Sequence, residues 1–169
     1  TQAMAGVTDP QTKVSVLDRA RAKAQVDAAG PGASEIARAR ARAAQDGRDM
    51  PISPLGSGSD YTPFLQHLGV PALNIGFGGE GESGGVYHSA YDTYEHHSRF
   101  VDPGFAYAAA LSKVGGRLML QLADAEAPVQ RYGDFADTVG GYVDEVKRLA
   151  DARRTEAETQ ARLLSGGLY

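Results

Sequence analysis

The chain has 169 residues, of which 42% are hydrophobic and 22% charged, and its net charge at pH 7 is −4. This is the composition of a folded domain with a sizeable core, and an acidic chain lacks the basic surface that nucleic acids require. No apolar run reaches the roughly 18–20 residues that cross a bilayer, so we expect neither a nucleic-acid partner nor a membrane segment in this chain. Because the sequence has no cysteine, a metal site here must use His, Asp or Glu.

The first 50 residues predict helices with little core of their own. Residues 12–46 are rich in Ala and Arg, which favour helix. The segment "AAGPGAS" at 28–34 divides them into two pieces, and Ser34 is the predicted N-cap of the second. Since apolar residues are sparse, we expect this stretch to lie on another part of the protein.

Residues 51–78 predict a turn, a short helix and a strand. "GSGSD" forms the turn, the helix runs from about residue 60 to 68, and Gly69 ends it. The apolar run "PALNIGF" at 71–77 is typical of a buried strand. This order is half of a βαβ unit and favours an α/β fold.

Two longer helices are predicted towards the C-terminus. The first runs from about residue 103 to 125 and is apolar on nearly every side, so we expect it to be buried nearly all round. The second runs from about residue 134 to 164 and starts with one apolar face. Such a face packs on a partner.

The segment "VYHSAYDTYEHH" at 86–97 holds three of the four histidines. His88 follows a Gly-rich loop and has Tyr87 before it and Asp92 after it. A phenol can donate to a developing oxyanion, and a carboxylate can orient an imidazole. However, one His and one Asp do not make a metal site, which needs three or four ligands. A serine triad of His88 and Asp92 with Ser57 or with Ser89 stays open on spacing alone.

The remaining histidines and motifs are weaker indications of a functional site. His67 falls on a polar helix face, and adjacent residues such as His96 and His97 rarely point at one ion, so we expect all three at the surface or in caps. "GSGSD" departs from the GxSxG pattern of a nucleophile turn. "GFGGEG" resembles a dinucleotide loop, but no helix follows it.

Two stretches in this order resemble one family. "LGSGSDYTPFLQHLGVPALNIGF" and "YHSAYDTYEHHSRFVDPGFAYAAALSKVGGRLMLQLADA" are similar to the zinc-dependent glutamate carboxypeptidase II and aminopeptidase family, in its transferrin-receptor-like branch. The hallmark Y-H-S-x-Y-[DE]-T-Y is matched at 87–94. The resemblance implies an α/β sandwich of helices on a mixed sheet, with 51–126 as the C-terminal part of the catalytic domain. Residues 1–50 would be a helical insertion, and 127–169 the start of a helical dimerisation domain.

The resemblance also implies roles for single residues. His88 matches the last ligand of a cluster of two zinc ions, and Tyr87 matches the phenol that stabilises the tetrahedral intermediate. Ser57 and Gly58 match the turn that lines the substrate cleft. The family's other ligands and its glutamate base find no match here. We therefore expect this chain to be a C-terminal portion of a longer enzyme, inactive by itself, that supplies one zinc ligand.

The predicted function is that of part of a co-catalytic two-zinc exopeptidase acting on small peptides. The expected partners are the peptide substrate, the remainder of the parent polypeptide, and a second copy bound through the C-terminal helices. The family implies a periplasmic or extracellular location. The alternatives are an inactive, transferrin-receptor-like binding or dimerisation scaffold and a stand-alone helical adaptor. Glutamate-releasing members carry arginines between the two motifs. Residues 70–87 contain no Arg or Lys and two acids, Glu80 and Glu82, so we expect no preference for an acidic residue next to the scissile bond.

Overall fold

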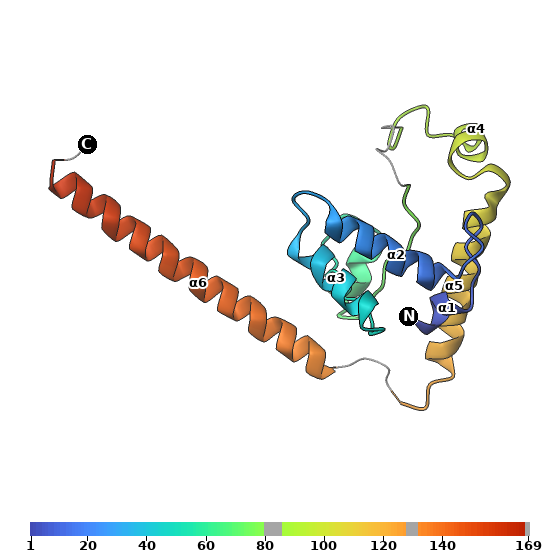
Figure 1. The fold of residues 1–169 in the computed structure, drawn as a ribbon, viewed down its shortest axis with the longest axis horizontal. Helices are drawn as coiled ribbons and strands as arrows, with labels where there is room; N and C mark the ends of the chain where they lie inside the picture. Colours follow the sequence, from blue (N-terminus) through green and yellow to red (C-terminus); the bar gives the residue numbers. More distant parts are fainter. Residues whose placement is uncertain (80–85, 128–131, 168–169) are drawn as a thin grey trace. The chain divides into compact units, whose positions relative to one another are not determined.

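The computed structural model describes residues 1–79, 86–127 and 132–167. The chain forms two compact units, Thr1–Asp124 and Ala125–Tyr169. The elements of the first unit, coloured along the chain in Figure 1, are the following: α1 (Gln2–Ala5), α2 (Val16–Ala29), α3 (Glu35–Gln45), η1 (Pro63–His67), α4 (Tyr94–His96), η2 (His97–Val101), η3 (Pro103–Phe105) and α5 (Ala106–Ala123). The second unit holds α6 (Tyr132–Ser165). The family roles predicted for 1–50, 51–126 and 127–169 stay predictions.

The two N-terminal helices begin where serine side chains cap them. Ser15 Oγ accepts a hydrogen bond from the Asp18 N–H at 3.0 Å, and Ser34 Oγ accepts one from the Ala37 N–H at 3.2 Å. Each bond satisfies a backbone donor that has no partner within the helix. The predicted pair of helices, the break between them and the cap at Ser34 are confirmed.

The core of the first unit is small and lies where α1, α2 and α5 meet. It consists of buried Ala and Val side chains, namely Ala3, Val7, Val16, Ala110 and Val114. Gly6, directly after α1, lies against the end of the Arg117 side chain of α5, since a Cβ on this residue would lie 2.3 Å from Arg117 Nη2. The N-terminal segment therefore packs on α5, as expected of a stretch that cannot form a core alone.

The start of α5 is fixed by a carboxylate four residues before it. Asp102 is 5% exposed, and its two oxygens accept hydrogen bonds from the N–H groups of Tyr107 at 3.0 Å and Ala108 at 2.8 Å. Burial alone would raise the pKa of Asp102, but these N–H groups outweigh it and lower the pKa. The chain reaches this geometry through two residues of positive φ, Gly104 at 78° and Phe105 at 57°. Asp102 is thus the cap that sets where α5 begins.

The prediction that the helix at 103–125 is buried nearly all round is wrong. Within α5 only Ala110 and Val114 are buried. Met119 and Leu120 are each 71% exposed. Leu118 packs partly buried against the core, whereas Met119, Leu120 and Leu122 lie at the exposed surface of the helix.

The predicted α/β sandwich with a mixed sheet is also wrong, because the described residues are helical and contain no strand. Residues 71–77, the predicted strand, have no regular structure. A strand exists only beside another strand that takes up its N–H and C=O groups, and no described segment pairs with this one in that way. Instead, Ile75 contacts α5 at Gly115, where a Cβ would lie 3.7 Å from Ile75 Cδ1. The one antiparallel bridge among the described residues joins Thr8 and Ser15.

The second unit consists of the long helix α6, which confirms the helix predicted at 134–164. Its apolar side chains are exposed within this unit: Tyr132, Phe135, Val139, Tyr142, Val143, Val146 and Leu149. None of the helices in the described part of the chain combines the length and the apolar character of a membrane span.

Candidate functional site

His88 lies in a tight turn that precedes α4. The Ser89 N–H donates to the Val86 carbonyl at 2.9 Å, and the Tyr91 N–H donates to Ser89 Oγ at 3.2 Å. His88 has φ of 62°, in the left-handed region that residues other than glycine seldom adopt. Such conformations concentrate where a side chain must be held for function. The turn therefore presents His88 in a constrained geometry.

The side chains of Tyr87 and His88 stack on each other at the surface. Their ring centroids are 3.7 Å apart, with an angle of 25° between the planes. Tyr87 is 76% exposed and His88 is exposed as well. Among the described residues, no side chain or backbone group forms a hydrogen bond with the phenol or the imidazole. Both polar groups are therefore open to a ligand.

The "GSGSD" turn, which carries Ser57 and Gly58, precedes η1. Gly58 has φ of 92°, and its N–H donates to Thr62 Oγ1 at 3.1 Å. Gln66 Nε2 donates to the Gly56 carbonyl at 2.7 Å and ties η1 back to the turn. Ser57 and Gly58 are exposed. Glycine suits this position because its backbone carries no Cβ to oppose a positive φ.

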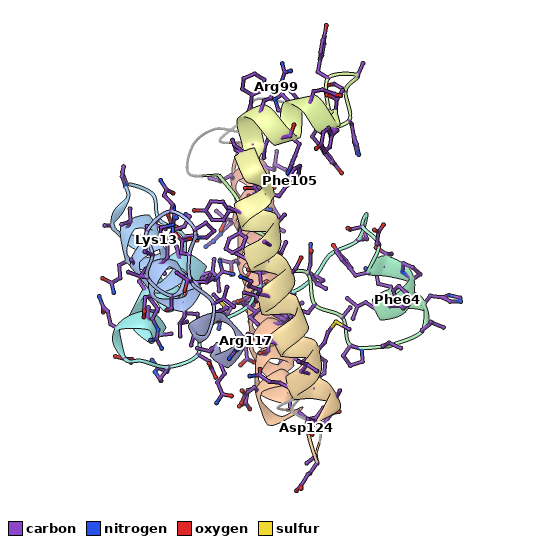
Figure 2. All side chains as sticks on the ribbon, turned by 90° about the vertical axis from the view of Figure 1, so that its right-hand side faces the viewer. Lys13, Phe64, Arg99, Phe105, Arg117 and Asp124 are labelled. Atoms are coloured by element: carbon purple, nitrogen blue, oxygen red, sulfur yellow. The ribbon has the colours of Figure 1, made fainter. Side chains whose placement is uncertain are left out.

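The described residues do not join the two predicted parts of the site. No hydrogen bond, ion pair or ring contact among them links Ser57 or Gly58 to Tyr87 or His88. In Figure 2, Arg99 of η2 lies beyond the amino-terminal end of α5, away from Phe64 of η1. Asp92 forms no described bond with the imidazole, and its N–H donates to the Ser89 carbonyl at 3.2 Å. The predictions for Glu80 and Glu82 lie outside the described residues.

The other histidines contact aromatic side chains or lie at the surface. The His96 ring lies 5.6 Å from Phe100, and the His97 ring lies 5.9 Å from Phe105. His67 in η1 and His97 are exposed, as predicted. The positive charge of His97 is one of the weaker causes that lower the pKa of Asp102. These residues belong to the local structure around the start of α5.

A buried polar network that the sequence did not predict joins the N-terminal segment to α5. Asp9 is fully buried, and its Oδ1 accepts from Arg19 Nη1 at 2.8 Å. The same nitrogen donates to the Tyr107 hydroxyl at 2.7 Å. Arg19 Nη2 donates to Gln11 Oε1 at 2.9 Å, and the Tyr107 hydroxyl lies 3.4 Å from that oxygen. The sequence contained one usable signal, since "DPQT" is a turn in which an Asp side chain accepts from the backbone.

The local turn and the arginine together keep the Asp9 carboxylate ionised. Oδ1 also accepts from the Thr12 N–H at 2.7 Å and from the Thr12 hydroxyl at 2.8 Å. Burial alone would raise the pKa of Asp9, but the hydrogen bonds from Thr12 and Arg19 and the arginine charge lower it from 3.8 to about 2. Oδ2 is buried and has no partner among the described residues.

Comparison with known proteins identifies relatives that each match part of the chain. The chain is 41% identical over 81 residues to "Probable glutamate carboxypeptidase LAMP1" of Arabidopsis thaliana, a match that covers 48% of the chain and 12% of the relative. It is 34% identical over 105 residues to "Probable glutamate carboxypeptidase" of Arthroderma benhamiae, covering 61% of the chain and 14% of that protein. It is 26% identical over 114 residues to "Aminopeptidase NAALADL1" of Mus musculus, covering 64% of the chain and 15% of the relative.

No family model matches the chain. No solved structure matches it significantly. The relatives nevertheless agree with the resemblance inferred from the two motifs, because they are named as glutamate carboxypeptidases and aminopeptidases. The chain is therefore similar to one region of proteins named as glutamate carboxypeptidases and as aminopeptidase NAALADL1, and it spans only 12% to 15% of the length of these three relatives.

Proposed function

We propose that the protein containing this chain is a two-zinc exopeptidase that hydrolyses small peptides, and that His88 is one of its zinc ligands. The observation that carries the proposal is the pair Tyr87–His88, which presents a free phenol and a free imidazole side by side in a constrained turn. The relation to proteins named as carboxypeptidases and aminopeptidases supports it.

The geometry of His88 fits one ligand position. Zinc binds a neutral imidazole nitrogen, and both ring nitrogens are unengaged by described residues. The described part of the chain brings no three of its His, Asp and Glu side chains together as a metal site requires. The proposal therefore takes the remaining ligands, and the glutamate that accepts the proton, from the remainder of the parent polypeptide. When bound, the two zinc ions would lower the pKa of a shared water and polarise the scissile carbonyl.

The role proposed for Tyr87 is to donate a hydrogen bond to the oxygen that becomes negative as the peptide bond is attacked. The Tyr87 phenol is exposed, and its ring stacks on that of His88, the proposed zinc ligand. The proposed role requires that the two rings keep this stacked arrangement when zinc and substrate are bound. A donor in that position stabilises the transition state more than the substrate, and so raises kcat. Ser57 and Gly58 would form part of the wall that receives the peptide.

A second copy of the protein is the partner that we propose for α6. Apolar residues recur along this helix at alternating spacings of three and four: Tyr132, Phe135, Val139, Tyr142, Val146 and Leu149. This is the repeat of a helix that packs along another helix. An inactive binding or dimerisation scaffold would use the same face, so α6 alone does not favour the enzyme over the scaffold.

Substitutions in the full-length protein test the proposal. His88→Ala should lower zinc content and peptidase activity together, whereas His67→Ala, which alters an exposed histidine of η1, should change neither. Tyr87→Phe should retain both zinc ions and lower kcat by ~10²–10³, the usual loss for one oxyanion donor. Full zinc content and full activity in His88→Ala would refute the assignment.

A further inference from the structure

Tyr107, in the first turn of α5, is the residue at which several distant segments meet. Its backbone N–H donates to Asp102 at 3.0 Å, its hydroxyl accepts from Arg19 at 2.7 Å, and its ring packs edge-on against Phe77 with 5.2 Å between centroids. In the sequence, Phe77 precedes and Asp102 follows the turn that carries His88. Tyr107 therefore contacts the chain on both sides of that turn, through its ring and through its backbone N–H.

The hydroxyl of Tyr107 is held by a network of limited freedom. Arg19 Nη1 contacts both the hydroxyl and the buried Asp9 carboxylate, so the arginine cannot move away without leaving that carboxylate unpaired. Breaking a buried ion pair is costly because one charge stays behind without compensation. The guanidinium carbon also lies 6.0 Å from the Tyr107 ring centroid. These contacts hold the Tyr107 ring in place.

The Tyr107 ring contacts the segment of the chain that precedes the His88 turn. The Phe77 ring packs against the Tyr107 ring with an angle of 68° between the ring planes, the edge-to-face geometry that aromatic pairs prefer. Two residues earlier, Ile75 contacts α5 at Gly115. Since residues 71–77 have no strand partner among the described residues, these two side-chain contacts are what attach the entering chain to α5.

The chain that leaves the motif is attached at the same end of α5. Asp102 receives the N–H groups of Tyr107 and Ala108, and Phe105 stacks with Tyr94 at 5.8 Å and with His97 at 5.9 Å. The helical segment α4–η2, which directly follows the His88 turn, therefore rests on residues of the α5 start.

We infer that Tyr107 is a positioning residue for His88: held by Arg19 and Asp9, it anchors Phe77, which precedes the His88 turn, and Asp102, which follows it. The inference rests on the proposed zinc role of His88 and adds to it a residue that touches neither metal nor substrate. A ligand must be held within about 0.5 Å of its productive position. An exposed turn without buried contacts of its own obtains that precision from its anchors.

Two substitutions in the full-length protein separate the two contacts of Tyr107. Tyr107→Phe keeps the ring under Phe77 and removes the hydroxyl, whereas Tyr107→Leu removes both. Met119→Ala, at a 71% exposed residue of the same helix α5, is the matched control. Zinc affinity should fall by ~10–100-fold in Tyr107→Leu, the effect of losing a group that orients a ligand. It should fall less in Tyr107→Phe and remain unchanged in the control.

Amide hydrogen exchange of the zinc-free protein gives a readout that does not depend on activity. Tyr107→Leu should accelerate exchange of the amides in residues 86–101 at least tenfold more than exchange of the amides in α3, to which Tyr107 has no described contact. A general loss of stability would accelerate both alike. Equal acceleration in the two segments, or unchanged zinc affinity in both Tyr107→Leu and Tyr107→Phe, would overturn the inference.

The outcome for His88→Ala distinguishes the two hypotheses. If His88→Ala lowers zinc content while the Tyr107 variants do not, the positioning role is wrong and the zinc role stands. If His88→Ala leaves zinc content unchanged, the proposed function is wrong. In that case, selective exchange in residues 86–101 would still support the anchoring by Tyr107 as a structural device.

Discussion

Arg19 Nη1 donates a hydrogen bond to the Tyr107 hydroxyl at 2.7 Å, although 88 positions separate the two residues in the sequence. The same nitrogen lies 2.8 Å from Asp9 Oδ1. One guanidinium thus couples the N-terminal turn to α5, and the packing of the first unit depends on it.

Replacing this arginine should destabilise the protein. Arg19→Met keeps most of the side-chain volume but leaves the Asp9 carboxylate buried without its cation, which should lower the free energy of unfolding by about 3 kcal/mol. Urea unfolding measures the change. Lys23→Met on the same helix is the matched control, because the Lys23–Asp27 pair is exposed and such pairs contribute less than about 1 kcal/mol. Equal losses in the two variants would contradict the prediction.

The lowered pKa of Asp9 predicts how stability depends on pH. The folded-state pKa is about 2 and the ordinary value is 3.8, so on acidification the unfolded chain takes up the proton first. The stability that Asp9 contributes is therefore fully present above about pH 4 and is lost as the pH falls through about 2. Asp102, whose pKa is also lowered, acts in the same direction.

Asp9→Asn isolates the contribution of this one carboxylate to acid sensitivity. The variant should be less stable than the unmodified protein at pH 6, and its stability should fall less steeply between pH 4 and pH 2. Urea unfolding at several pH values over this range gives the slope. A slope equal to that of the unmodified protein would show that Asp9 does not titrate as proposed.

The positive φ of Gly58 predicts a backbone effect without a packing effect. No atom lies within 4 Å of a Cβ built on Gly58, so Gly58→Ala should lower the free energy of unfolding by about 1–2 kcal/mol through the left-handed conformation alone. Gly56→Ala in the same turn is the control, since Gly56 also has open space and its φ is not in that region. Thermal unfolding of both variants tests the difference, and similar melting temperatures would exclude it.

Local signals in the sequence were sufficient for some elements. Ser34 capped the predicted helix because the cap needs only the next three residues. The start and end of α6 also followed from its own periodicity and flanking residues. Such elements are determined by contacts within one or two helical turns.

Features that depend on distant residues could not be predicted. The run 71–77 has the composition of a strand, yet a strand needs a partner that no local pattern reveals. The burial of α5 was overestimated because apolar residues such as Met119 do not show which neighbours will cover them. The Arg19–Tyr107 bond and the left-handed φ of His88 likewise arise from packing and turn geometry, and neither is written in residue spacing.

The two oxygens of the Asp9 carboxylate differ in their hydrogen bonding, and this difference determines which of them would accept a proton. Four donors converge on Oδ1, from the N–H groups of Gln11 and Thr12, the Thr12 hydroxyl and Arg19, while Oδ2 has no partner among the described residues. An incoming proton therefore adds to Oδ2, the only oxygen with free lone pairs, and none of the four bonds has to break first. Protonation would therefore remove the negative charge of the carboxylate and leave the Arg19 guanidinium as an uncompensated positive charge at this point of the fold.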